Sequence, residues 1–145
     1  MYDFVDRSVT SLDAGGRFLV WSMRSWVKSL GGSHCPASAI ANAFARWKMI
    51  GGLQHFHRMM LLLNRDGLEK LRFCSLACNK VSEHEAILLA IVSALAMDRS
   101  IQARDTIALL IAEDSVGDLL WEMHALARAM ELVSLVPILP DRSRA

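Results

Sequence analysis

The sequence predicts an all-α fold, a compact single-domain bundle of about six helices around a buried central helix. Residues 82–97 have the length and composition of a buried helix, and apolar residues recur at helical spacing on both sides of them. No segment alternates apolar and polar residues in the way that a half-buried strand does. Six helices with short connections in 145 residues are typical of a helical bundle.

The central helix is expected to begin at Ser82 and to end at Met97. Ser82 and Glu85 match a capping box, in which each side chain binds the backbone amide of the other residue. From Ala86 to Met97 every residue except Ser93 is apolar, so that no polar face remains. A helix that is hydrophobic all round is a buried one, and this helix is therefore expected to form the core of the bundle.

The N-terminal part is expected to consist of a flexible arm, residues 1–10, followed by an amphipathic helix. Either Ser11 or Asp13 can cap this helix, because both have side chains that accept hydrogen bonds from the first helical amides. The helix is expected to end at Leu30, before the glycine pair 31–32. The single helical domain is expected to cover residues 11–136.

The other elements are expected from similar signals. The remaining predicted helices are residues 36–50, 53–63, 101–113 and 115–133. The glycine pair 51–52 is expected to end the first of these, and Ser115 to cap the last. Residues 68–81 fit neither period and remain open between a short helix and an extended segment. The C-terminal tail is expected to be residues 137–145, and its two prolines, Pro137 and Pro140, end the helical region.

The composition favours a cytoplasmic protein over a membrane-spanning, secreted or disulfide-rich one. Although 53% of the residues are hydrophobic, no apolar run approaches the roughly 18 residues of a membrane-spanning helix. The first 13 residues lack the basic and apolar regions of a secretory signal, and three cysteines are too few for a disulfide scaffold. We therefore expect a cytoplasmic protein without a membrane span. Its surplus hydrophobicity suggests self-association.

The net charge of +1 conceals a difference between the two halves of the chain. Residues 1–80 contain 11 Lys and Arg against 5 Asp and Glu, whereas residues 81–145 contain 5 against 10. The two halves can attract each other within one fold or across a dimer. Alternatively, the first half presents a basic face to an anionic partner.

The most distinctive exposed pattern is a predicted cationic face on the first helix, formed by Arg17, Trp21, Arg24 and Lys28. Cations that flank an indole can bind phosphates while the indole stacks on a base, as in a nucleic-acid-binding regulator. The same face suits an anionic membrane surface or an acidic protein. It can also be a solvated basic face on which the arm or a second subunit covers Trp21.

The candidate zinc ligands are Cys74, Cys78, His84 and Cys35. The spacing of Cys74 and Cys78 suits one pair of ligands, but a tetrahedral site needs two more that only the tertiary fold can supply. The alternative is that the cysteines remain free and pack as small hydrophobic side chains. If residues 74–78 are helical, a disulfide between Cys74 and Cys78 is not expected on geometric grounds.

No motif points to an enzyme. The chain lacks a phosphate-binding glycine loop, a GxSxG turn and an HExxH pair, so no catalytic residue and no further cofactor are expected. The residues Cys78, Lys80-Val81-Ser82 and Glu85-Ala86-Ile87-Leu88-Leu89 resemble a pattern in small bacterial helical proteins from families of unknown function. This resemblance implies a bacterial helical domain and no particular activity.

Three functions follow from these features. The leading interpretation is a non-enzymatic interaction or regulatory protein that acts through protein–protein contacts, as a homo-oligomer. The alternative is a nucleic-acid-binding regulator that uses the predicted cationic face. A further alternative is a small helical bundle that binds an apolar ligand in a pocket lined by Met and Trp. Met59, Met60 and Met123 are candidates for that lining, although methionines also fill ordinary cores.

Overall fold

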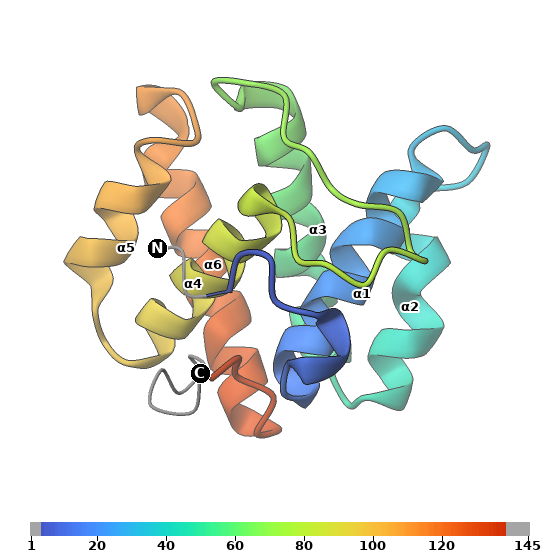
Figure 1. Ribbon diagram of the computed structural model, residues 1–145. Coiled ribbons are helices and arrows are strands. Elements are labelled where there is room, and N and C mark those ends of the chain that lie inside the picture. The colour runs from blue at the N-terminus through green and yellow to red at the C-terminus, as the bar shows by residue number, and fades with distance from the viewer. Residues whose placement is uncertain (1–3, 139–145) are drawn as a thin grey trace.

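The computed structural model describes residues 4–138, which form six α-helices, two 3₁₀ turns and no β-strand (Figure 1). The all-α prediction is therefore confirmed. The elements are η1 (Val9–Ser11), α1 (Ala14–Ser29), α2 (Pro36–Arg46), α3 (Ile50–Asp66), α4 (Glu83–Ala96), α5 (Ser100–Ile107), η2 (Glu113–Ser115) and α6 (Val116–Leu132). Among the described helices, none is both long and apolar enough to cross a bilayer. The ends of the expected arm and tail lie outside the described residues.

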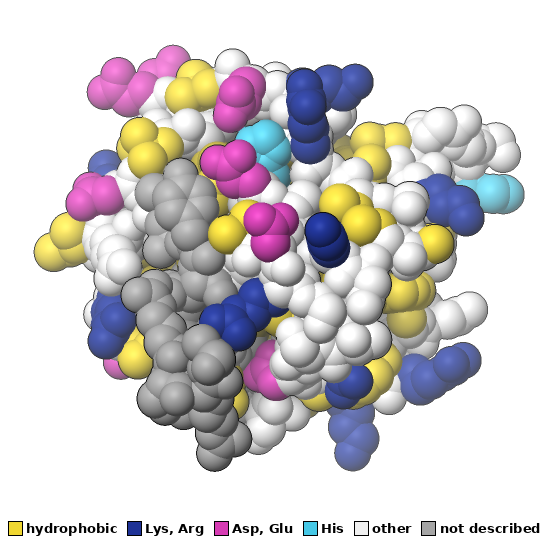
Figure 2. Space-filling view, in the orientation of Figure 1, with side chains coloured by type: hydrophobic (Ala, Val, Ile, Leu, Met, Phe, Trp, Pro, Cys, Tyr) yellow, Lys and Arg dark blue, Asp and Glu magenta, His cyan; other side chains and the backbone are white. Residues whose placement is uncertain are grey.

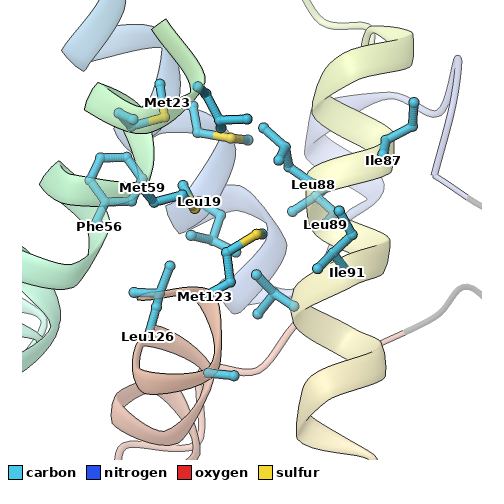
Figure 3. Packing of buried hydrophobic residues seen from close by; sticks show 14 of the residues in the cluster. Leu19, Met23, Phe56, Met59, Ile87, Leu88, Leu89, Ile91, Met123 and Leu126 are labelled. Carbon is cyan, nitrogen blue, oxygen red and sulfur yellow. The ribbon is translucent and has the colours of Figure 1, made fainter. Parts of the chain in front are cut away.

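Helix α4 is the buried central element and packs against α1, α5 and α6. The capping box at its start is confirmed. The Glu85 amide donates to the Ser82 hydroxyl (3.3 Å), and the Ser82 amide donates to Glu85 Oε1 (2.9 Å). Figure 3 shows Leu88, Leu89 and Ile91 of α4 in an interior that α1, α3 and α6 also line. The apolar circumference predicted from the sequence is thus used for packing on several sides.

The boundary between α2 and α3 differs from the prediction. Helix α2 ends at Arg46, because Lys48 adopts a positive φ of 62° that no helix continues through. Gly51 and Gly52 lie in the first turn of α3 instead of ending α2. A Cβ on Gly52 would lie 3.2 Å from the Cβ of Ala129 on α6, so the glycine permits a close approach of the two helices.

Helix α5 is shorter than predicted and ends at Ile107. The chain then leaves the helix and pairs with the end of α3, where the Ala112 amide donates to the Asp66 carbonyl (3.0 Å). The Ser115 hydroxyl donates to Asp66 Oδ2 (2.7 Å) and makes no capping hydrogen bond with α6. Ser115 therefore stands at the N-cap position of α6 as expected, but its hydroxyl binds a tertiary partner instead of a helical amide.

The segment that precedes α4 is not helical and contains a turn at residues 76–77, and the described part of the N-terminal arm lies against it. Residues 68–81 form no helix, which decides between the two alternatives that the sequence left open. The Asp6 amide donates to the Val81 carbonyl and the Val81 amide donates to the Arg7 carbonyl, both at 2.9 Å. Phe4 is fully buried. The segment expected to be a flexible arm is thus packed on the domain in its described part.

Candidate functional site

The structure separates the four residues of the predicted cationic face. Arg17, Trp21 and Lys28 are exposed on α1, whereas the Arg24 side chain is buried, with 4% of the residue exposed. Helix α1 presents Arg24 to the start of α4, where it meets the carboxylate of Glu85. The expectation that Arg24 belongs to an exposed binding face is therefore corrected. Its charge is paired with Glu85 inside the fold and does not face a ligand.

Arg24 has a hydrogen bond for each of its guanidinium donors. Its Nε donates to Glu85 Oε2 (2.7 Å) and its Nη2 to Glu85 Oε1 (3.0 Å). The remaining donors reach the backbone carbonyls of Ser75 (3.0 Å), Cys78 (2.6 Å) and Lys80 (2.8 Å). Hydrogen bonding to Glu85 outweighs desolvation and raises the pKa of Arg24, so the guanidinium stays charged. The pair joins α1 to α4 and holds residues 75–80 over the contact.

A second cation and a second indole join Arg17 and Trp21 from the neighbouring helix. Arg46 and Trp47, at the end of α2, line one groove of about 550 Å³ together with the two residues of α1. Trp21 is 40% exposed and Trp47 45% exposed. We call this feature, formed by Arg17, Trp21, Arg46 and Trp47, the α1–α2 groove. Its lining contains no carboxylate, so it suits a flat anionic ligand.

The basic character of this region extends beyond the groove. Residues 14–65 contain seven Lys and Arg and no Asp or Glu. Within the described part of the chain, Arg17, Lys28, Arg46 and Lys48 make no ion pair. Figure 2 shows Lys and Arg side chains at its lower right, over the start of α1 and the end of α2, whereas most acidic side chains lie toward the upper left.

Sequence reasoning missed Arg46 and Trp47 because it continued the second helix to residue 50. On a longer helix Trp47 shares the apolar face, but the chain leaves the helix after Arg46 and the indole is half exposed. The ring still contacts the core at one edge, with its centroid 5.9 Å from that of Phe18. The absence of acidic residues from 14 to 65 was the available signal for a wider basic surface.

The candidate zinc ligands do not assemble into a site. Among the described residues, no group of three or more His, Cys, Asp or Glu side chains is placed to hold a metal ion. The His84 Nδ1 accepts a hydrogen bond from the Arg72 amide (2.8 Å), and Cys35 is exposed beside the start of α2. Cys74 and Cys78 lie on either side of a turn at residues 76–77, which the hydrogen bond from the Cys78 amide to the Ser75 carbonyl closes (3.0 Å).

An exposed apolar surface lies on α5 and α6, and α5 is on the side of the bundle away from α2 (Figure 1). Ile101 and Leu109 on and after α5 are 80% and 66% exposed, and Trp121 of α6 is 69% exposed. Ile101 and Leu109 line one shallow hollow and Trp121 lines another, and the two hollows share Ser100. We call the surface of Ile101, Leu109 and Trp121 the α5–α6 face. Large exposed side chains of this kind commonly mark a contact with another chain.

An apolar pocket of about 500 Å³ lies between α1, α3 and residues 67–73. Trp26, Met60 and Phe73 are among its lining residues, which agrees in part with the expected Met and Trp lining. Met59 and Met123 are core residues instead (Figure 3). The indole of Trp26 donates to His57 Nδ1 (2.9 Å), and burial lowers the pKa of His57. Both rings are thereby fixed at the edge of the core.

Comparison of the chain with models of protein families, with curated proteins and with solved structures found no significant match. Inferences about function therefore depend on the surfaces and side-chain clusters described above.

Proposed function

We propose that the protein acts by binding and not by catalysis, as an interaction protein that self-associates through the α5–α6 face. The supporting observation is the exposure of Ile101, Leu109 and Trp121 by two thirds or more on adjoining parts of one surface. Burying such side chains against a second copy removes apolar area from water at roughly 25 cal/mol per Å². Tryptophan is also enriched among the residues that dominate binding energies.

The charges on α5 support a second copy as the occupant of this face. Arg104 and Asp105 are adjacent and exposed between Ile101 and Leu109, and neither makes an ion pair within residues 4–138. A two-fold axis that pairs α5 with its counterpart brings Arg104 of one copy toward Asp105 of the other. A surface with both charges around an apolar centre is therefore complementary to itself, as a two-fold dimer requires.

Light scattering coupled to size-exclusion chromatography tests this proposal. We expect the wild-type protein to be a dimer at micromolar concentration and the double variant Ile101→Glu, Trp121→Glu to be a folded monomer. Leu132→Glu is the matched control, because Leu132 is 87% exposed at the end of α6, about three turns from Trp121, and lines neither hollow of the face. A monomeric wild type contradicts the proposal, and so does a control variant that dissociates to the same extent.

The cytoplasm is the proposed location of this protein, because three cysteines are too few for the disulfide scaffold of a small secreted domain. The apolar-ligand alternative has less support, because Met59 and Met123 fill the core and only Met60 lines the pocket beside α1.

Nucleic-acid binding is a second candidate function, and the α1–α2 groove favours it. Two indoles can stack on bases while Arg17 and Arg46 bind the adjoining phosphates. Arg24 is excluded from this role by its burial, so the binding residues differ from the set that the sequence suggested. Lys28 on α1 and Lys48 after α2 are further exposed cations near the same two helices.

Fluorescence anisotropy with a labelled single-stranded oligonucleotide of mixed sequence at low salt tests the second candidate. We expect Arg46→Glu to weaken binding about tenfold or more, because it replaces a phosphate contact with a repulsive charge. Arg99→Glu changes the net charge equally at an exposed position beside α5 and should have a much smaller effect. Absence of binding by the wild type at low salt, or equal losses for both variants, excludes this function.

A further inference from the structure

Cys74 directly precedes, and Cys78 ends, a turn that the Arg24–Glu85 pair holds in place. The Cys78 amide donates to the Ser75 carbonyl (3.0 Å), which closes a β-turn over residues 75–78. On one side the Cys74 amide donates to Glu85 Oε2 (3.3 Å), and on the other Arg24 Nη1 donates to the Cys78 carbonyl (2.6 Å). Both cysteines are therefore bound through their backbones to one buried ion pair.

This geometry removes the objection that a helical segment raises to a Cys74–Cys78 bond. In a helix the two residues would be separated by one regular turn with their Cβ vectors poorly placed for a disulfide. The structure has no helix there, and the chain reverses between the two cysteines. Both thiols are partly accessible and free. We propose that Cys74 and Cys78 form a reversible disulfide by exchange with a low-molecular-weight disulfide.

The environment divides the two cysteines into an attacking and a resolving thiol. A backbone hydrogen bond at Lys80 and the thiol of Cys74 lower the pKa of Cys78. Burial, followed by hydrogen bonding to Cys78, raises the pKa of Cys74. Since the thiolate is the nucleophile, these directions favour Cys78 as the thiol that reacts first and Cys74 as the one that resolves the mixed disulfide.

The exchange uses oxidised glutathione as the model oxidant. The Cys78 thiolate attacks one glutathione sulfur, the glutathione S–S bond breaks, and one glutathione leaves as a thiolate. Cys74 then loses its proton and attacks the Cys78 sulfur, which forms the Cys74–Cys78 bond and expels the second glutathione. Two electrons pass from the cysteines to the glutathione disulfide, and the two protons end on the two reduced glutathione molecules.

The disulfide would act on the segment that closes over Arg24. In the reduced protein the carbonyls of Ser75, Cys78 and Lys80 accept hydrogen bonds from the guanidinium, and these bonds help to hold the loop in place. A covalent bond across the turn reduces the freedom of that loop in both the folded and the unfolded chain. The redox state of the pair therefore sets how firmly residues 75–78 are held against α1 and α4.

Intact mass spectrometry of the Cys35→Ser protein after reaction with oxidised glutathione tests this proposal. Cys35 is the third cysteine and is exposed, so its replacement leaves Cys74 and Cys78 as the remaining thiols. We expect a monomer that has lost the mass of two hydrogen atoms, carries no glutathione, and returns to its starting mass with dithiothreitol. A glutathione adduct that persists, a disulfide-linked dimer or an unreactive protein overturns the proposal.

The same reaction in urea tests whether the folded structure brings the two thiols together. If it does not, the two cysteines react only because they are close in sequence. We expect the intramolecular bond to form about tenfold faster in the folded protein than in the unfolded chain, because the turn holds the thiols near each other. An equal or slower rate in the folded protein contradicts the inference. The Cys35→Ser, Cys74→Ser variant provides the control, because its Cys78 should retain the glutathione adduct in the folded state.

Discussion

Glu85 takes part in both local and tertiary structure, because it caps α4 and also pairs with Arg24 of α1. Glu85 Oε1 accepts the Ser82 amide at the start of α4 and also the Arg24 guanidinium from α1. Removing two charges from water is costly, and the cost is offset only where every donor has a partner, as Arg24 has here. The sequence predicts the capping box from local spacing. It cannot predict the ion pair, because that depends on where α1 crosses α4.

Replacing Glu85 with Ala should destabilise the protein by about 3–5 kcal/mol, because it leaves the buried Arg24 charge without a counterion. The double variant Arg24→Met, Glu85→Leu should recover part of this loss, since neither charge remains. It should stay below wild type, because the carbonyls of residues 75, 78 and 80 and the Ser82 amide lose their partners. Urea unfolding followed by circular dichroism measures both free energies. A single variant that loses less than about 1 kcal/mol shows that water already solvates the pair.

The Trp26–His57 hydrogen bond makes stability depend on pH. The indole donates to His57 Nδ1, which accepts only without a proton, and burial lowers the pKa of His57 from its ordinary value of 6.5. As pH falls below 6.5, the unfolded chain binds this proton before the folded protein does, so the free energy of unfolding decreases. Above that pH the contribution of His57 is fully present.

Comparing wild type with His57→Gln by thermal unfolding between about pH 7.5 and 5.5 isolates this contribution. Gln does not titrate in that range, so the melting temperature of the variant should fall less than that of the wild type. Parallel curves for the two proteins contradict the role of His57. The comparison is a difference between proteins, so the other histidines contribute equally to both curves.

At the scale of elements, the contact between α3 and α6 explains why the sequence placed the boundary between α2 and α3 at residues 51–52 and not at residues 47–49. Adjacent glycines are a common helix-ending signal, so the sequence favoured a break at residues 51–52. In the structure the pair serves packing, because Gly52 faces Ala129 and Leu126 of α6 while Gly51 faces open space. A local pattern cannot distinguish a glycine that ends a helix from one that admits a neighbouring helix.

Gly52→Ala and Gly51→Ala form a matched pair that tests this interpretation. Gly52→Ala should destabilise the protein by about 1–3 kcal/mol, because its Cβ would approach Met49 and Ala129 too closely. Gly51→Ala, one residue away in the same turn, should be neutral or stabilising by up to about 1 kcal/mol, since alanine is the better helix former. Chemical unfolding measures both, and equal effects would contradict the packing role of Gly52.

At the scale of the whole molecule, the features predicted from the sequence are those that depend on local pattern. The all-α class, the start of α4 and its burial follow from apolar spacing and one cap. The α1–α2 groove could be predicted only in part, because Arg46 and Trp47 join Arg17 and Trp21 through the packing of two helices. The Cys74–Cys78 pair likewise depends on a turn held by Arg24 and Glu85 from two other elements.

The N-terminal segment tests whether residues outside the helices contribute to the stability of the fold. Phe4 is fully buried, and the backbone beside it pairs with Val81 just before α4. Phe4→Ala should therefore lower the free energy of unfolding by about 3–5 kcal/mol, as expected for an aromatic core side chain. It should also speed amide hydrogen exchange at Val81. Leu132→Ala, an exposed position, is the control. A loss below about 1 kcal/mol for Phe4→Ala would support the loosely held arm that the sequence alone suggested.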